Sequence, residues 1–148
     1  MVDPDESRLE VAKTFGATKL VSTNAVDEIL KLTAGKGVDV AIEAVGVPGT
    51  FSICQGIVAA GGHIANIGVH GKSVELHLEK LWARNITITT RLVDTVTTPL
   101  LLKTVISRKL EPQRLITHHF ALNEIMKAYD TFGNAAKEKA LKVILSNS

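Results

Sequence analysis

Two apolar runs of the sequence each end near a glycine, and this placement favours ligand binding. Residues 38–42 are followed by the segment EAVG at 43–46, and residues 63–67 are followed by Gly68. In open α/β sheets ligands bind outside the carboxyl ends of the strands, and glycine there lets a ligand approach the backbone. The alternative is that both glycines simply open tight turns, where glycine is common.

Asp3 is the first acidic side chain with a candidate role. It follows a short extended piece and directly precedes a predicted helix, which is where a dinucleotide-binding fold hydrogen-bonds the adenosine ribose. Such an acid normally lies about 20 residues after the first strand and its Gly-x-Gly-x-x-Gly loop. Gly35 and Gly37 begin that pattern, but Val40 fails its third position. On spacing alone, Asp3 is equally an acid at a helix N-terminus, stabilised by the helix dipole.

Metal and nucleophile chemistry has little support in the sequence. Cys54 is the single cysteine, so an internal disulfide and a Cys-rich metal site within this chain are excluded. It lies among apolar residues of a predicted helix, which favours a small core residue. His118 and His119 are adjacent in a predicted strand and would point to opposite faces, without a third ligand at suitable spacing. The other histidines are scattered, and we expect no catalytic residue and no metal ligand in this chain.

The segment from residue 38 to residue 71 reads as a strand–helix–strand unit. The helix is predicted over residues 49–60 and is expected to stop at Gly61 and Gly62. Its apolar side chains recur at helical spacing: Phe51, Cys54, Ile57 and Val58. Strands joined by a helix of this length must be parallel, because a hairpin turn cannot connect them.

Shorter elements are predicted on both sides of this unit. Strand and helix alternate regularly up to Arg91 and less regularly after it. Further helices are expected over residues 4–16, 25–33, 78–83, 99–107 and 123–132, and further strands over 19–21, 86–90, 118–121 and 141–145.

The composition indicates a globular α/β protein. The chain has 148 residues, of which 45% are hydrophobic and only 4% aromatic, so Val, Ile, Leu and Ala must build the core. That mixture suits parallel strands covered by helices on both faces. The net charge is +2 and the basic residues are scattered, which argues against nucleic acid and membrane surfaces as partners. No apolar stretch reaches membrane-spanning length and no signal peptide is visible, so a cytoplasmic location is expected.

The order of the motifs resembles the C-terminal part of zinc-dependent alcohol dehydrogenases of the medium-chain dehydrogenase/reductase superfamily. The resemblance covers essentially the whole chain. It rests on six segments: VDPDESRLEVAKTFGAT at 2–18, AGKGVDVAIEAVG at 34–46, GGHIANIGVHG at 61–71, LVDTVTTP at 92–99, KLEPQRLITHHF at 109–120 and AYDTFGNAAKEKALKVIL at 128–145.

The resemblance implies an incomplete Rossmann-type parallel sheet, without its first strand and glycine loop, and a C-terminal α+β segment. Residues 1–91 would form a partial NAD-binding domain, and residues 92–148 would return to a catalytic domain. That catalytic domain would hold the zinc and the proton-relay residues, and none of it is found in this sequence. We therefore expect a fragment that is inactive alone and holds no zinc.

The resemblance also implies a set of NAD-binding residues. Asp3 matches the acid that binds the adenosine ribose, Arg8 a basic residue near that ribose, and Lys142 a basic residue on the pyrophosphate side. The other matches follow the strands: Ala44, Val45 and Gly46 against the adenosine and nicotinamide riboses, Gly68 and Val69 at the nicotinamide carboxamide, and Leu92 and Val93 beside the nicotinamide. Some have plainer interpretations: Arg8 and Lys142 as solvated charges, and Val45, Val69 and Leu92 as ordinary core.

The implied activity is hydride transfer between an alcohol or aldehyde and NAD. Two alternatives stay open: a non-catalytic oligomerisation module, and a methyltransferase-like nucleotide-binding domain, which also uses an acid after its second strand. A homo-oligomer is expected through the strand that begins at Ile86 and ends at Thr90. This strand reads as a sheet edge without the lysine, proline or glycine that usually blocks pairing.

Overall fold

The structure is a computed structural model that describes residues 1–92 and 96–147. The chain divides into two compact units, and each is described by itself. The first unit comprises residues 1–4 and the described part of 18–93, and the second comprises residues 5–17 and the described part of 94–148. The predicted division into residues 1–91 and 92–148 with separate roles stays a prediction.

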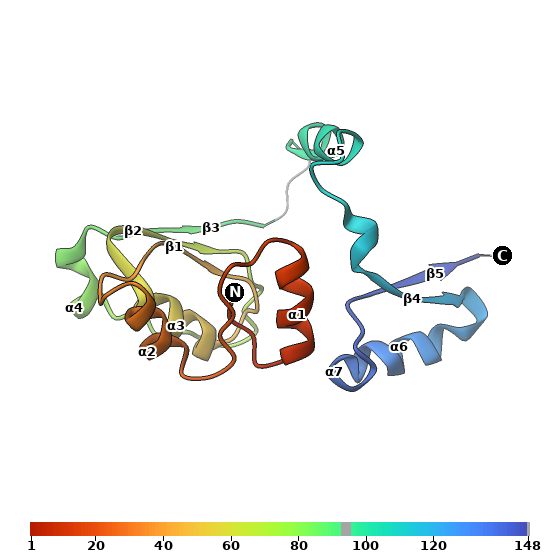
Figure 1. The fold of residues 1–148 in the computed structure, drawn as a ribbon, viewed down its shortest axis with the longest axis horizontal. Helices are drawn as coiled ribbons and strands as arrows, with labels where there is room; N and C mark the ends of the chain where they lie inside the picture. The colour runs from red at the N-terminus through yellow and green to blue at the C-terminus, as the bar shows by residue number, and fades with distance from the viewer. Residues whose placement is uncertain (93–95, 148) are drawn as a thin grey trace. The chain divides into compact units, whose positions relative to one another are not determined.

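A parallel sheet of three strands forms the centre of the first unit (Figure 1). The strands are β1 (Val38–Glu43), β2 (Val58–Asn66) and β3 (Thr87–Thr90), in the order β1-β2-β3. Ala41 pairs with Ile64 of β2, and Ile64 pairs with Ile88 of β3. Because all three strands run in one direction, their carboxyl ends lie along one edge of the sheet.

The crossover between β1 and β2 is helix α3 (Pro48–Ile57), as the predicted strand–helix–strand unit requires. Proline occupies its first turn, where a missing N–H costs nothing. The predicted end of this helix at residue 60 is wrong. Val58 is already extended, with ψ at 135°, and β2 includes the two glycines that were expected to stop the helix. Its pairing with β1 shifts register between Val58 and His63. A β carbon at Gly62 would crowd Ala59 O and the Val58 side chain, each at 2.8 Å, so glycine here serves the packing of the strand.

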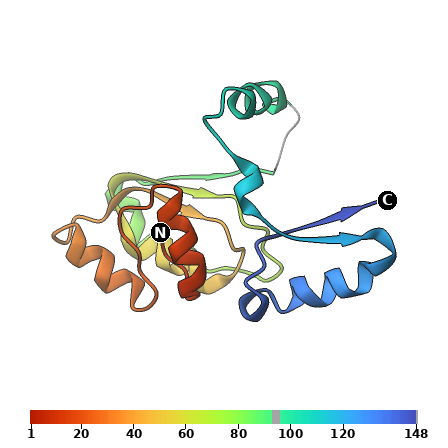
Figure 2. The same cartoon turned by 45° about the vertical axis from the view of Figure 1, so that its right-hand side comes forward.

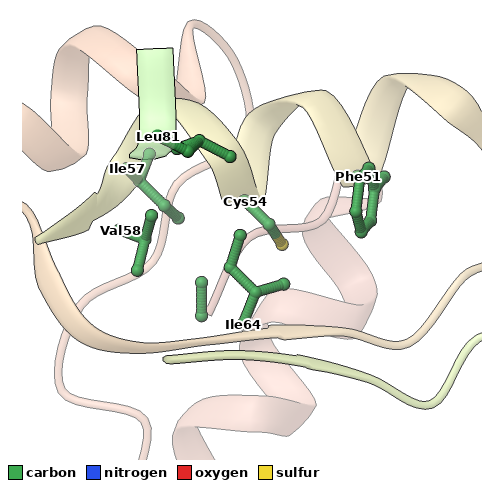
Figure 3. Close-up of a cluster of buried hydrophobic side chains, with 7 residues drawn as sticks. Phe51, Cys54, Ile57, Val58, Ile64 and Leu81 are labelled. Atoms are coloured by element: carbon green, nitrogen blue, oxygen red, sulfur yellow. The ribbon is translucent and has the colours of Figure 1, made fainter. Parts of the chain in front are cut away.

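The core of the first unit lies between α3 and the sheet. Its side chains come from α3, β1, β2 and the short helix α4 (Leu78–Leu81). Besides Ala41 of β1, the cluster contains the six residues labelled in Figure 3: Phe51, Cys54, Ile57, Val58, Ile64 and Leu81. Helix α2 (Ala25–Leu32) packs against this cluster through Val26 and Ile29. On β1 the buried Ala41 points towards α3, and the neighbouring Val40 and Ile42 point to the opposite face of the sheet, where they are 54% and 63% exposed. The described helices of this unit therefore cover one face of the sheet, whereas the composition favoured cover on both.

Two short features complete the first unit. An isolated parallel bridge joins Val2 to Val21 outside the named strands. The 3-10 turn η1 (Trp82–Arg84) follows α4 and leads into β3. Within the described part of the chain, no helix is both long and apolar enough to cross a membrane.

The second unit combines a parallel strand pair with helices (Figure 2). Strands β4 (Ile116–Ala121) and β5 (Lys142–Ser146) pair in parallel, with α6 running beside them. The remaining elements are α1 (Glu6–Thr14), α5 (Thr98–Ile106), η2 (Pro112–Leu115), η3 (Leu122–Glu124), α6 (Ile125–Gly133) and α7 (Ala135–Glu138). Arg114 of η2 joins α1 to this unit, because its guanidinium donates to Thr14 O at 2.9 Å and lies 4.3 Å from the Phe15 ring centre.

Candidate functional site

Two loops at the carboxyl edge of the three-stranded sheet touch each other. Residues 44–46 follow β1, and residues 67–71 follow β2. The backbone of Gly46 has φ at +86°, and a β carbon there would overlap the backbone of Val69. A β carbon at Gly68 would likewise overlap the Glu43 carboxylate and the Gly46 N–H. Both glycines are therefore required by close backbone approach, which is more than the opening of ordinary turns.

Glu43 ends β1 and lies beneath both loops, with its side chain fully buried. Its Oε1 atom accepts hydrogen bonds from Val45 N at 3.0 Å, Gly46 N at 2.8 Å and Thr50 Oγ1 at 2.5 Å. Burial raises the pKa of this carboxyl. The opposing effects are larger: hydrogen bonds from Thr50, Gly46 and Val45, together with nearby His70, stabilise the ionised form. The pKa of Glu43 is therefore lowered from its usual value. Glu43 is therefore an ionised carboxylate held in the interior by loop donors.

The second carboxylate oxygen of Glu43 faces the loop after β2. His70 Nε2 lies 3.3 Å from Glu43 Oε2 and 2.8 Å from Asn66 Oδ1. Asn66 in turn donates from Nδ2 to Gly68 O at 3.1 Å. The His70 ring meets Phe51 edge-on, with 6.0 Å between ring centres. One buried acid thus contacts residues of both loops.

The proton arrangement at His70 follows from its neighbours. The amide of Asn66 is oriented by its bond to Gly68 O, so its oxygen faces the imidazole. An amide oxygen and a carboxylate both accept, and Nε2 must therefore carry the proton that it donates. Two buried polar atoms in the described part of the chain, Glu43 Oε2 and His70 Nδ1, have no hydrogen-bond partner. The 3.3 Å approach of His70 Nε2 to Glu43 Oε2 is therefore a close contact without a hydrogen bond.

Most of the predicted binding residues of the first unit meet at this edge. Ala44, Val45 and Gly46 form the first loop, and Gly68 and Val69 belong to the second. Leu92 follows β3 and so lies beyond the carboxyl end of the third strand. The alternative reading of three of these residues as ordinary core is wrong, because Val45, Val69 and Leu92 are 65%, 79% and 77% exposed.

The remaining predicted residues have different surroundings. Asp3 directly follows the bridge between Val2 and Val21 and donates its N–H to Val21 O at 3.2 Å. The acid that caps helix α1 is Asp5, whose side chain accepts from Ser7 N and Arg8 N, and Asp3 lies two residues before it. Arg8 belongs to the second unit, where it faces Asp5 at 3.8 Å.

Two further predicted residues complete the comparison. Lys142 is the exposed first residue of β5 in the second unit and pairs with Ile116. Val93 lies outside the described residues. Arg8 and Lys142 therefore belong to the second unit, and the predicted contacts of these residues with the cofactor stay predictions.

Sequence reasoning missed Glu43, Thr50, Asn66 and His70. One signal was present: Glu43 ends an apolar run, and strand alternation places it on the same face as buried Ala41. An acid on the buried face of a strand needs partners, which indicates a polar network. No comparable pattern marks His70, because a loop residue has no periodicity.

Metal binding receives no support from the described side chains. Across residues 1–92 and 96–147, no three His, Cys, Asp or Glu side chains are grouped to hold a metal ion. No zinc-dependent step is therefore assigned to this chain.

The parallel sheet, its crossover helix and the paired loops at its carboxyl edge define a Rossmann-like cofactor domain. A family model described as zinc-binding dehydrogenase matches residues 1–107, and the chain belongs to this family. Both the resemblance seen in the sequence and the predicted α/β fold class are confirmed, and the chain corresponds to the C-terminal, cofactor-binding part of such enzymes.

Individual relatives agree with this assignment. The chain is 29% identical to an alcohol dehydrogenase of Cupriavidus necator over 154 residues, which covers 97% of this chain and 41% of that protein. It is 34% identical to L-idonate 5-dehydrogenase of Vitis vinifera over 149 residues, covering 93% and 41%. The chain thus spans about two fifths of the length of the curated relatives that it matches.

Solved structures show the same fold. A zinc-dependent alcohol dehydrogenase 2 from Streptococcus pneumonia, in its apo form, is 55% identical with a TM-score of 0.95 and covers 100% of this chain and 44% of its own. Alcohol dehydrogenase TADH from Thermus sp. ATN1 is 28% identical with a TM-score of 0.90, covering 99% and 43%.

Proposed function

We propose that this chain is the cofactor-binding part of an NAD-dependent, zinc-containing alcohol dehydrogenase, which transfers hydride between an alcohol or aldehyde and NAD. One observation carries the proposal beyond family membership. Exposed apolar side chains and close-packed glycines gather at the carboxyl ends of three parallel strands, where Rossmann folds bind nucleotides. The names of the relatives, alcohol dehydrogenase among them, support the substrate class.

The resemblance assigns the contacts that each residue would make with the dinucleotide. Asp3 would accept hydrogen bonds from the adenosine ribose, with Arg8 and Lys142 as basic partners of the ribose and pyrophosphate. The loop of Ala44, Val45 and Gly46 would lie along the riboses. The remaining contacts are assigned to the nicotinamide end: Gly68, Val69, Leu92 and Val93. When bound, NAD supplies the hydride acceptor, and these residues bind and orient it.

The zinc and the proton-relay residues of the proposed enzyme belong to a catalytic domain that residues 92–148 would rejoin. The chain on its own is therefore expected to be inactive and to bind NAD with a Kd of about 1 mM or weaker. NADH formation with a panel of alcohols and added zinc tests the first point. Zinc-dependent turnover clearly above that of heat-treated protein would contradict it.

We further propose that the chain forms a symmetric homo-oligomer through the strand from Ile86 to Thr90. In the described sheet β3 is the last strand and pairs with β2. Its N–H and C=O groups on the other side suit pairing with a second copy.

Cofactor binding is tested by titrating the ¹⁵N-labelled chain with NAD and following amide chemical shifts. We expect shifts that are still increasing at about 10 mM NAD and that concentrate at residues 44–46 and 67–71. The variant Asp3→Gly should bind NAD more weakly, and it should lose preference for NAD over NADP because the acid repels a 2′-phosphate. The exposed variant Asp39→Asn is the matched control. Two results would refute the proposal: shift changes that avoid both loops, or no shift changes at about 10 mM NAD.

A further inference from the structure

Glu43 uses its two carboxylate oxygens on two different loops. Oε1 holds the loop after β1 through the N–H groups of Val45 and Gly46, and Oε2 faces His70 of the loop after β2. Hydrogen bonds to an ionised acceptor are about twice as strong as neutral ones, which strengthens the bonds at Oε1. Oε2 makes no hydrogen bond, and its contact with the second loop is the close approach of the carboxylate to His70 Nε2 at 3.3 Å. The same buried carboxylate thus contacts both loops.

The backbone reinforces this connection. Ile67 N and Gly68 N both donate to Glu43 O, at 2.8 and 3.1 Å, so the second loop also begins on the same residue. Asn66 then orients Gly68 O, and its oxygen accepts from His70. The chain of contacts runs from the first loop through Glu43 to His70 and Asn66, and back to the backbone at Gly68.

We propose that Glu43 and His70 are positioning residues that couple the loop at 44–46 to the loop at 67–71, and that this coupling forms the nicotinamide side of the cofactor site before the cofactor binds. The role in cofactor binding rests on the function proposed above. The coupling of the two loops rests on the geometry alone.

The two residues do not need to touch the cofactor for this role. Glu43 is buried: its Oε1 atom accepts from Val45, Gly46 and Thr50, and its Oε2 atom lies 3.3 Å from His70 Nε2. A pre-formed site avoids the cost of ordering loop backbone when the ligand arrives. Loss of either residue should therefore weaken the binding of the nicotinamide end more than that of the adenosine end, whose proposed acid is Asp3.

The coupling is tested without any ligand by amide hydrogen exchange in the labelled chain. In His70→Leu, which keeps packing against Phe51 but removes the donor, protection of the Val45 and Gly46 amides should fall about tenfold. His70→Gln keeps a donor near the same place and should restore most of that protection. Glu43→Gln should release both loops, with exposed Glu28→Gln as the control for loss of one charge.

The role in binding is tested by comparing NAD with ADP-ribose, which lacks the nicotinamide. In His70→Leu and Glu43→Gln the Kd for NAD should rise about tenfold, and that for ADP-ribose should stay within about twofold of the wild type. If Glu43→Gln does not fold, His70→Leu and Thr50→Val decide the question.

The two proposals fail in different ways. Wild-type protein that binds neither NAD nor ADP-ribose overturns the proposed function, and amide exchange still judges the coupling. Wild-type protein that binds both while His70→Leu leaves loop exchange and the NAD to ADP-ribose ratio unchanged overturns the positioning role alone.

Discussion

Gly46 and Val69 lie in backbone contact across the ends of two neighbouring strands. A β carbon at Gly46 would overlap Val69, and the φ of +86° is a conformation that residues with side chains rarely adopt. We predict that Gly46→Ala lowers the free energy of unfolding by at least about 2 kcal/mol. The cost of a left-handed backbone conformation at alanine and the cost of overpacking against Val69 both contribute to this loss. The melting temperature should fall by roughly 5 °C or more, which circular dichroism can follow.

Gly49→Ala is the matched control for this substitution. Gly49 lies three residues further on, in the first turn of α3, where a β carbon would meet nothing within 4 Å. Alanine there should leave stability unchanged or raise it by about 0.5 kcal/mol. Equal melting temperatures for the two variants would show that the two loops do not constrain Gly46.

Gln55 fixes the segment that leads from β2 to α4. Its buried side chain donates from Nε2 to Glu75 O at 2.9 Å and accepts at Oε1 from His77 N at 2.8 Å. We predict that Gln55→Leu costs about 1–2 kcal/mol, because the shape is similar but two backbone groups lose their partners. Chemical denaturation measures the loss, and faster exchange of the His77 amide should accompany it.

Exposed Gln113 in the second unit provides the comparison for Gln55. Gln113→Leu should change the free energy of unfolding by less than about 0.5 kcal/mol. If Gln55→Leu lowers the free energy of unfolding as little as Gln113→Leu, the prediction is wrong, and water replaces the bonds that Gln55 makes to Glu75 O and His77 N.

The sequence predicted the ends of the strands better than their beginnings. The carboxyl ends of β1 and β2 follow from apolar runs that stop at the EAVG segment and at Gly68, and the binding loops were assigned there. The start of β2 was missed because Gly61 and Gly62 read locally as a helix stop, whereas Gly62 fits the close packing of strand residues 58–59. Tertiary packing decided a conformation that local propensity favours otherwise.

The polar network beneath the loops could be predicted from the sequence only in part. Strand alternation places Glu43 on the buried face, which a reading of the sequence can detect. Its partners Thr50 and His70 lie 7 and 27 positions further along the chain, on a helix and in a loop. Only the crossover geometry brings them to one point, and no periodic signal encodes that meeting.

Cys54 should resist both ionisation and modification in the folded chain. Burial, and secondarily the charge of Glu43, raise the pKa of the thiol from 9.0 to about 11. We predict slow reaction with a disulfide reagent at pH 8 in native protein and fast reaction in denaturant. Rapid stoichiometric labelling of the native chain would contradict the buried position.

The same raised pKa predicts how stability changes in alkali. The thiol of Cys54 ionises at lower pH in the unfolded chain than in the folded chain. The contribution of the neutral thiol to stability is therefore complete below pH 9.0 and decreases as the pH rises towards about 11. The loss is at most about 1.4 kcal/mol per pH unit. The difference in unfolding free energy between wild type and Cys54→Ala isolates this effect, and it should shrink as the pH rises through that interval.

Strand β3 offers the test of the proposed oligomer. Its Ile88 is half-buried and packs against the core cluster, so a proline there would disturb the core as well as the edge. Thr87 and Thr89 are exposed, lie on the same face of the strand and are better positions for substitution. In a symmetric antiparallel pair of β3 strands in which Ile88 faces its own copy, Thr87 lies opposite Thr89 of the partner. Charges at these two positions would then face charges of the same sign.

We therefore predict that the wild-type chain is a dimer by light scattering. The double variants Thr87→Lys/Thr89→Lys and Thr87→Glu/Thr89→Glu should each raise the dimer Kd about tenfold, because like charges directly opposite are unfavourable. An equimolar mixture of the two should form a heterodimer with a Kd at least as low as that of the wild type, since opposite charges then face each other. Exposed Thr98 and Ser107, at the two ends of α5, accept the same lysine and glutamate pairs as a control away from the strand. A monomeric wild type, or lysine and glutamate variants that dimerise equally well alone and mixed, would exclude pairing through β3.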